Sequence, residues 1–355
     1  MSYISDIETA TKSNISQRRL TTSCSENRVP GETMNGNVWF VPSNTEKRAN
    51  GKYIDASERD KRALKPFVKW AGGKGQLLEE IRKKYPRELG KSINKYAEPF
   101  VGGGAVLFDI LSNYKLKEVY ISDINAELIN AYKVIRDNVS ELVKQLEILQ
   151  AEYIPMDTDE RKHYYYQKRD RYNDMKINGG NNVEKAALFI FLNKTCFNGL
   201  YRVNRKGQFN VPIGAYKKPL ICDKKNLVDV SAALQNVEIV CGDFKESYDF
   251  IDSNTFVYFD PPYRPLNETS NFTSYTENNF DDKAQIELAE YVDKLDNIGA
   301  KVIVSNSDPK NWDSNDNFFE KLYQKHKIVR VQASRMINCN ASLRGKISEL
   351  LITNY

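Results

Sequence analysis

The residues best placed to do chemistry are Asp260, Pro261, Pro262 and Tyr263, which directly follow the apolar run FVYF. Two consecutive prolines lack backbone N–H donors and stiffen the chain. The corner therefore offers acceptors, namely the Asp260 carboxylate and the Pro261 carbonyl oxygen. Two acceptors suit the two N–H bonds of a planar amino group on a ring such as adenine, and Tyr263 can stack on that ring. The alternative is a rigid turn with a buried tyrosine.

A glycine-rich turn, Val101-Gly102-Gly103-Gly104, lies between a predicted strand and the helix-like segment AVLFDIL. Glycine at such a turn lets a ligand approach the backbone closely. The dinucleotide fingerprint GxGxxG is broken, because Leu107 stands where its third glycine would be. The turn therefore indicates either a ligand site or a tight strand–helix connection.

Two further carboxylates end predicted strands. Asp123 ends the segment 118–123, where a carboxylate can accept hydrogen bonds from ribose hydroxyls. It can equally cap the helix that follows. Asp243 ends the segment VEIVCGDF and can receive a hydrogen bond from an adenine amino group, with Phe244 packing on the ring. The alternative for Asp243 is again a cap or a turn.

Strands alternate with helices from Pro66 onward, which predicts an α/β fold with a mostly parallel, doubly wound, Rossmann-like sheet. Ligands bind such sheets outside the carboxyl ends of the strands, and the candidate residues all fall there. The predicted strands are 95–100, 118–123, 237–244, 255–263, 300–307 and 346–355, and a long amphipathic helix is predicted over 282–298.

Three regions differ in composition. Residues 1–64 are rich in Ser, Thr, Asn, Lys and Arg and show no sustained period of 3.6 or 2, which predicts a flexible extension. The pair Trp39-Phe40 within it suggests docking onto the folded body or a small accessory element. Residues 151–234 interrupt the alternation and predict an inserted, mainly helical recognition domain. The catalytic domain would then comprise residues 65–150 and 235–355.

The composition excludes several classes of protein. The chain has 355 residues, 41% of them hydrophobic, which is enough for a real core. No apolar run is long enough for a transmembrane helix, and the N-terminus lacks a signal-peptide core, so we expect a cytoplasmic protein without a membrane partner. Five scattered cysteines and two histidines argue against a metal site. The formal net charge of +5 permits a polyanionic partner without requiring one.

Together these motifs resemble the DNA adenine-N6 methyltransferases of the Dam class, in the motif order of the alpha group. The closest likeness is to modification methylases of the DpnII type, which act on GATC. The resemblance runs from Pro66 to Tyr355. It is carried by KPFVKWAGGKGQLL at 65–78, EPFVGGGAVLF at 98–108, SDINAELINAY at 122–132, FNGLYRVNRKGQFNVPIGAY at 197–216, FVYFDPPYRPL at 256–266 and RGKISELLITNY at 344–355.

The resemblance implies S-adenosylmethionine as the methyl donor. By match of motif, Trp70 and Lys74 would contact its methionine portion, although Trp70 could instead be a core aromatic. Asp260 would be the catalytic acid, with Pro261 and Tyr263 as its helpers. The implied donor-binding residues are Trp70, Lys74, Phe100, Gly102, Gly104, Asp123 at the ribose, Asp243 and Phe244 at the adenine, and Asp260.

The resemblance also implies double-stranded DNA as the substrate, with an adenine flipped out of the stack. Base reading is expected within 195–219, where Arg202 matches the arginine that reads guanine. Arg is the commonest bidentate partner of guanine, and apolar atoms suit the thymine methyl group. Leu200 and Pro212 match the apolar contacts, and Asn198 completes the expected DNA-binding set. Phosphate contacts are expected from Lys194, Arg205, Lys206, Lys217 and Lys218.

Other functions fit part of this pattern. One is an adenine methylase of single-stranded DNA or of another sequence. A second is a non-catalytic DNA-binding regulator that retains the donor site, against which the intact DPPY argues. A nicotinamide oxidoreductase is disfavoured because GxGxxG is broken. A modification methylase would share its site with a cognate restriction endonuclease, with or without physical contact.

Overall fold

The computed structural model describes residues 64–264, 280–334 and 346–355 of the chain. Nearer the N-terminus it describes residues 3–6, 8, 10, 16–26, 29, 32–36, 38–43, 45–47 and 53–55. The chain divides into two compact units, Met1–Ala63 and Leu64–Tyr355. Across the described ranges, no helix combines the length and apolarity needed to cross a membrane.

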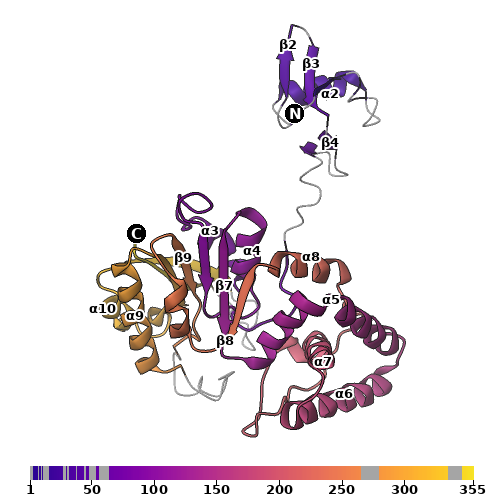
Figure 1. Ribbon diagram of the computed structural model, residues 1–355, viewed down its shortest axis with the longest axis vertical. Helices are drawn as coiled ribbons and strands as arrows, with labels where there is room; N and C mark the ends of the chain where they lie inside the picture. The colour runs from indigo at the N-terminus through magenta and orange to yellow at the C-terminus, as the bar shows by residue number, and fades with distance from the viewer. Residues whose placement is uncertain are drawn as a thin grey trace. The chain divides into compact units, whose positions relative to one another are not determined.

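A seven-stranded sheet in the order β11-β12-β10-β9-β6-β7-β8 forms the centre of the larger unit (Figure 1). Its strands are β6 (Lys95–Glu98), β7 (Glu118–Asp123), β8 (Val237–Cys241), β9 (Thr255–Phe259), β10 (Lys301–Ser307), β11 (Lys327–Ser334) and β12 (Lys346–Thr353). The neighbouring strands β10, β9, β6, β7 and β8 run parallel to one another, and β12 runs antiparallel to both of its neighbours. The predicted α/β fold with a mostly parallel sheet is confirmed. The edge strand β11 was not among the predicted strands.

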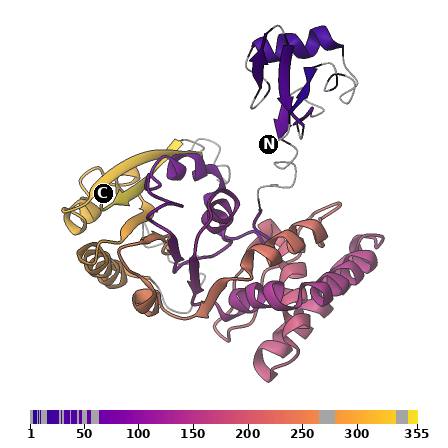
Figure 2. The same ribbon diagram turned by 45° about the horizontal axis from the view of Figure 1, so that its top comes forward.

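Helices and short helical turns connect these strands. They are η2 (Lys74–Gln76), α3 (Leu78–Arg82), α4 (Ala105–Asn113), α5 (Ala126–Tyr153), α6 (Thr158–Asn178), α7 (Asn182–Thr195), η3 (Phe197–Gly199), α8 (Lys224–Leu234), η4 (Phe244–Phe250), α9 (Asp282–Asn297), η6 (Pro309–Asn311) and α10 (Phe318–Leu322). Figures 1 and 2 show α5 to α8 gathered beside the β8 edge of the sheet, with α9 and α10 toward the other edge.

Both faces of the sheet are buried, because successive side chains of a strand point to opposite faces. In β9, Phe256 and Tyr258 join a cluster that includes Leu107 of α4. Val257 and Phe259 join the second cluster, which includes residues of α9. This two-sided burial explains why the central strands read as continuous apolar runs rather than as alternating patterns.

The chain reverses its direction of travel across the sheet between β6 and β9. From β6 it proceeds to β7 and then β8, whereas from β9 it proceeds to β10 on the other side. Ligands of doubly wound sheets bind at this switch point, outside the carboxyl ends of the strands. The turn 99–104 follows β6 and the DPPY sequence follows β9, so both motifs meet at the switch point.

The segment 196–213 folds back on itself between α7 and α8. Isolated bridges pair Cys196 with Ile213 and Val203 with Phe209. Helix α6 anchors the returning strand through side chains, because Asn173 bonds both the N–H and the carbonyl of Phe209, at 2.7 and 3.0 Å. We call residues 196–213 the hairpin segment.

Asn193 joins the hairpin segment to the beginning of the larger unit. Its buried amide donates to the carbonyls of Lys69 (2.8 Å) and Gly199 (3.0 Å) and accepts from the Lys69 N–H (2.8 Å). One side chain therefore holds residue 69 and residue 199 in fixed relation, using all but one of its hydrogen-bonding sites.

The unit Met1–Ala63 has a small core of its own. A three-stranded antiparallel sheet in the order β1-β3-β2 and the helix α2 bury Ala10, Leu20, Cys24, Val29 and Val41, with Trp39 packed against them. Its elements are β1 (Tyr3–Ser5), α2 (Gln17–Ser25), β2 (Thr33–Asn35), β3 (Val38–Pro42), β4 (Thr45–Lys47) and β5 (Tyr53–Asp55). Where the sequence predicts a flexible extension, the structure has a compact unit. Its few core residues come from separate short elements, so no stretch shows a period.

We expect Asn193→Ala to lower the free energy of unfolding by about 1–3 kcal/mol, because the backbone groups of Lys69 and of the buried Gly199 lose their partner. Urea unfolding followed by circular dichroism measures this. Asn130→Ala is the matched control, since Asn130 donates one exposed hydrogen bond to the Asn182 carbonyl. Equal destabilisation by both substitutions would contradict the anchoring role of Asn193.

Candidate active site

The glycine turn after β6 requires glycine at two positions. Gly102 and Gly104 have φ of +47° and +73°, in the region where a Cβ is strained. A Cβ on Gly102 would lie 2.8 Å from Cδ1 of Trp70, and one on Gly104 would lie 2.5 Å from the Tyr132 hydroxyl. That hydroxyl donates to the Gly102 carbonyl at 3.1 Å. The turn is therefore closely packed and positions its backbone rigidly.

Asp123 lies beside this turn at the end of β7. Its carboxylate accepts from the Gly102 N–H at 3.1 Å and from the Asn125 N–H at 2.9 Å. The residue that caps α5 is Asn125, which accepts from the N–H groups of Glu127 and Leu128. Burial raises the pKa of the Asp123 carboxyl, and the backbone N–H donors oppose that rise. The capping alternative therefore does not explain Asp123.

Asp243, in contrast, is a cap. Its side chain accepts from the Lys245 N–H at 3.0 Å, and the Glu246 carboxylate accepts from the Asp243 N–H in return. Phe244 is buried and stacks on Phe100, with 5.5 Å between the ring centroids. The adenine-binding role predicted for Asp243 and Phe244 stays a prediction, which the exposed carboxylate leaves sterically open.

Lys74 and Asp260 form a buried ion pair. The Lys74 ammonium lies 2.7 Å from Oδ1 of Asp260, and the two side chains are only 4% and 20% exposed. The same ammonium donates to the Gly72 carbonyl (2.8 Å) and lies 4.6 Å from the centroid of the Tyr263 ring. Burial raises the pKa of Asp260, and the charge and hydrogen bond of Lys74 oppose this. The KWAGGK segment thus contacts the DPPY corner directly.

Tyr263 is held in place by Glu349 of β12. The phenol donates to Oε2 of Glu349 at 2.5 Å. Burial and the negative charges of Asp260 and Glu349 raise the pKa of Tyr263 well above its ordinary value, so the phenol is neutral at physiological pH. The hydrogen bond fixes the tilt of the ring beside the Asp260 carboxylate.

Glu98 is another acidic residue near Asp260, and the sequence motifs did not point to it. It ends β6, is buried, and accepts from the Tyr96 hydroxyl at 2.7 Å. Burial raises its pKa well above the ordinary value; the charge of Asp260 adds to this and that of Lys74 opposes it. A charged residue at the end of an apolar strand was the available signal for Glu98, and a charge inside the run ISELLIT was the signal for Glu349.

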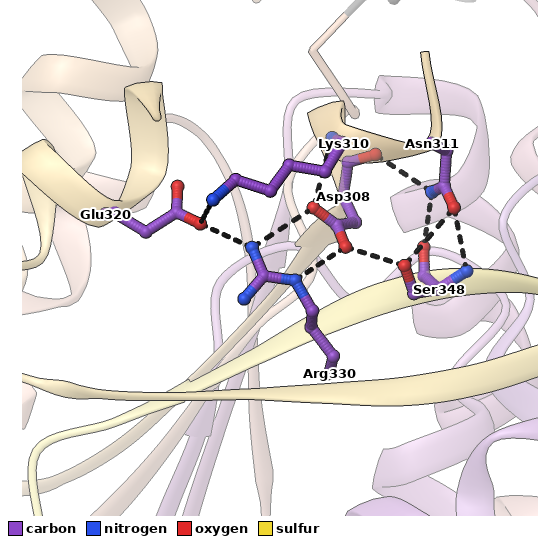
Figure 3. Close-up of polar contacts among 6 residues, drawn as sticks. All are labelled: Asp308, Lys310, Asn311, Glu320, Arg330 and Ser348. Carbon is purple, nitrogen blue, oxygen red and sulfur yellow. Dashed lines mark hydrogen bonds and ion pairs between the residues drawn. The ribbon is translucent and has the colours of Figure 1, made fainter. Parts of the chain in front are cut away.

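A polar network beyond Glu349 fixes the strand that carries it (Figure 3). The buried Asp308, just after β10, accepts from Nε of Arg330 (2.8 Å) and from the Ser348 hydroxyl (2.6 Å). The Asn311 amide bonds both the N–H and the carbonyl of Ser348. Ser348 precedes Glu349 in β12, so this network sets the position of the carboxylate that holds Tyr263.

Trp70 connects the glycine turn to the hairpin segment. Its ring stacks on Tyr201, with 5.5 Å between centroids and 23° between planes, and it lies 6.2 Å from the ring of Phe189. The ring edge lies against Gly102. Trp70 is half-buried against the main core, so the core-aromatic interpretation describes its packing and leaves part of the ring accessible.

The residues predicted to bind DNA lie together on the hairpin segment. Arg202, Asn198 and Pro212 are exposed, and Leu200 is half-buried. Nε of Arg202 donates to Oδ1 of Asn210 at 2.8 Å, which orients the guanidinium. Of the predicted phosphate contacts, Arg205, Lys206, Lys217 and Lys218 are exposed. Lys194 is half-buried, and burial followed by the charge of Lys69 lowers its pKa.

Within the part of the chain that the structure describes, no three His, Cys, Asp or Glu side chains are grouped so as to hold a metal ion. The carboxylates of Asp260, Glu98 and Glu349 interact with the Lys74 ammonium, two tyrosine hydroxyls and backbone N–H donors.

Residues 70–337 match the model of the D12 class of N6 adenine-specific DNA methyltransferases. The chain belongs to this family. It is 52% identical over 294 residues to the type II methyltransferase M.MjaIII of Methanocaldococcus jannaschii, covering 82% of this chain and 99% of that protein. It is 39% identical over 300 residues to the type II methyltransferase M1.LlaDCHI of Lactococcus lactis subsp. cremoris, covering 84% and 98%. It is 34% identical over 285 residues to a DNA adenine methylase of Escherichia coli K12, covering 80% and 93%.

The D12 methyltransferase therefore acts on DNA at the N6 amine of adenine, and the resemblance to the Dam class is confirmed. S-adenosylmethionine is the donor that this family implies. The assignments of individual residues, and the GATC specificity, stay predictions.

We expect the rate of methyl transfer to fall as the pH falls through the raised pKa of Asp260, because only the ionised carboxylate keeps Oδ2 as a free acceptor while Oδ1 is bonded to Lys74. Lys74→Met removes the cation that lowers this pKa, so the acidic limb should move to higher pH. Glu349→Gln removes a charge that raises it, so the limb should move to lower pH. The profile of kcat/KM against pH measures both shifts. Shifts in the same direction would contradict the assignment to Asp260.

Proposed function

We propose that this D12 methyltransferase transfers a methyl group from S-adenosylmethionine to the N6 amine of adenine within GATC in double-stranded DNA, as the modification partner of a restriction system. The observation that carries the proposal is the meeting of Lys74, Asp260 and Tyr263 beside the glycine turn at the switch point of the sheet. Two of the relatives are named type II methyltransferases, which supports the restriction partnership.

The proposed donor site combines the glycine turn, where the backbone has no side chain, with the carboxylate of Asp123. The glycines at 102 and 103 leave no side chain over the turn, and any Cβ there would meet Trp70 within 3.1 Å. Asp123 presents a partly exposed carboxylate held by two backbone N–H groups, which suits a pair of ribose hydroxyls. When bound, the donor supplies a methyl group on a positively charged sulfur. The residues present fit such a molecule.

The target amine would be oriented by Asp260 and Pro261. Oδ1 of Asp260 already accepts from Lys74, which leaves Oδ2 and the Pro261 carbonyl as acceptors for the two N–H bonds. Hydrogen bonding to both N–H groups turns the nitrogen lone pair out of conjugation with the ring. Tyr263, fixed by Glu349, would stack on the flipped base. Oδ2 of Asp260 would then accept the proton that the amine releases. Positioning and electrostatics supply the rate enhancement in this account.

We further propose that residues 151–234 form the target-recognition domain and that residues 65–150 with 235–355 form the catalytic domain. Asn193 and Trp70 both join the hairpin segment to the segment that bears Lys74, so base reading and chemistry are mechanically linked. The orientation of the Arg202 guanidinium by Asn210 supports its use as a planar fork for guanine. The exposed lysines after the hairpin segment would contact phosphates.

We expect Asp260→Ala to lower methyl transfer by about 10²–10³-fold while donor binding is retained. Asp123→Ala should instead weaken donor binding by about 1.5–3 kcal/mol, because charge-assisted hydrogen bonds are lost. Calorimetry with S-adenosylmethionine and single-turnover methylation of a GATC duplex separate the two effects. Unchanged donor affinity in Asp123→Ala, or transfer within tenfold of wild type in Asp260→Ala, would refute the respective role.

We expect Arg202→Ala to cost about 1–3 kcal/mol of discrimination at one base pair, so that altered sites are methylated more readily relative to GATC. Lys217→Ala is the control, since loss of a phosphate contact should weaken binding to all sequences alike and lower the salt slope by about one unit. Relative rates on the GATC duplex and on each single-base variant measure this. A uniform drop across all duplexes would contradict guanine reading by Arg202, and a different preferred sequence would contradict GATC.

A further inference from the structure

The unit Met1–Ala63 is not accounted for by the methyltransferase family. The family match begins at residue 70, and the relatives align with about four-fifths of the chain. Yet the unit has a core, a helix and a three-stranded sheet. A folded unit carried on a DNA-modifying enzyme calls for a function of its own.

After β1, its described elements are the helical positions 6, 8 and 10, the helix α2 and a β-ribbon, which is the order of the two helices and the ribbon in a helix-turn-helix module. Asp6, Glu8 and Ala10 are helical, and Ala10 shares the small core with Leu20 and Cys24 of α2. The antiparallel pair β2–β3 follows α2, with Gly36 at φ +62° in its turn. In helix-turn-helix proteins the second helix enters the major groove, and its N-terminal residues meet the base edges.

Helix α2 presents one polar face to solvent. Arg18, Thr22 and Ser25 are exposed and recur at the i, i+4, i+7 spacing of a single face. Leu20, Ser23 and Cys24 are buried on the opposite side. Within residues 17–25 the outer face therefore consists of one cation and side chains that donate and accept hydrogen bonds, as a surface that reads base edges does; the exposed Glu26 follows at the C-terminal end of the helix.

The charges at the start of α2 are unfavourable for an isolated helix. The first turn has no acidic residue and contains Arg18 and Arg19, although the helix dipole favours negative charge there. The Ser16 side chain does not cap the helix. Asp6 is buried and accepts from the Gln17 amide (3.2 Å) and the Thr21 hydroxyl (3.4 Å), so it lies on the inner side of α2. A phosphate backbone would supply negative charge on the outer side of the start of the helix.

We propose that the Met1–Ala63 unit is a second DNA-binding module, which places the N-terminal half of α2 in the major groove of duplex DNA and sets the β2–β3 ribbon against the adjoining backbone. The exposed Thr33, Met34 and Asn35 of β2 carry no charge that would repel phosphates. Because the module and the methyltransferase unit belong to one chain, binding by either raises the effective concentration of the other on the same DNA.

The proposal is tested on the full chain with two duplexes that carry one central GATC. One is about 15 bp, which one unit occupies, and the other is about 40 bp, which leaves several helical turns free. Wild type should bind the longer duplex about tenfold or more tightly, and Arg18→Glu should abolish most of this difference and reduce the salt slope by about one unit. Binding and methylation of the short duplex should be unchanged.

Lys83→Glu is the matched control, because Lys83 is also a surface cation, belongs to the larger unit and forms an ion pair with the neighbouring Glu80. Thr22→Asp is the second variant, since it adds a negative charge to the same face of α2 without touching the core. Circular dichroism confirms folding of each variant. If Arg18→Glu and Thr22→Asp both bind the longer duplex as wild type does, or if Lys83→Glu loses the length dependence equally, the proposal is overturned. Failure of methylation on the short duplex in wild type would instead overturn the proposed GATC activity.

Discussion

The buried ion pair between Lys74 and Asp260 is the interaction on which the site depends. Asp260 lies close enough to Glu98 and Glu349 for their charges to interact, and burial disfavours ionisation of Asp260. Two or three like charges cannot remain ionised in one buried place without a cation. Lys74 is that cation, at 2.7 Å, and it also lies against the Tyr263 ring. The ion pair thus sets the charge state of the DPPY corner and holds the start of η2 at the carboxyl end of β9.

Most other features keep this corner in place. The parallel sheet brings the ends of β6 and β9 side by side, which no local sequence preference could do. The antiparallel strand β12 adds Glu349, and the Asp308–Arg330–Ser348 network fixes that strand. Trp70, through its stacking on Tyr201, and Asn193, through its hydrogen bonds, connect the segment that bears Lys74 to the hairpin segment. Buried polar groups with all partners present specify a unique geometry, whereas partly satisfied ones would destabilise it.

The two strand-end aspartates show how similar sequence contexts acquire different surroundings. Asp123 is the last residue of β7 and Asp243 lies two residues after β8, and each precedes a helical element. Asp243 caps its own helix, whereas Asp123 leaves the cap to Asn125 and turns toward Gly102 instead. A hydrogen bond between residues 102 and 123 depends on the pairing of β6 with β7, so the local sequence around Asp123 could not reveal it.

The sequence by itself determined the fold class, because apolar runs alternating with amphipathic helices are the pattern of a sheet buried on both faces. It also determined the family, through motifs such as DPPY and FVGGG whose residues are contiguous. The sequence did not predict the edge strand β11 or the compact fold of the Met1–Ala63 unit. Short elements from separate parts of the chain share one core there, so their apolar residues show no regular spacing along the sequence. Only the tertiary structure decided that Lys74 pairs with Asp260, that Glu98 and Glu349 join them, and that Trp70 stacks on Tyr201. These contacts link residues distant in sequence, and their energy comes from burial and from charges that become neighbours only when the chain is folded.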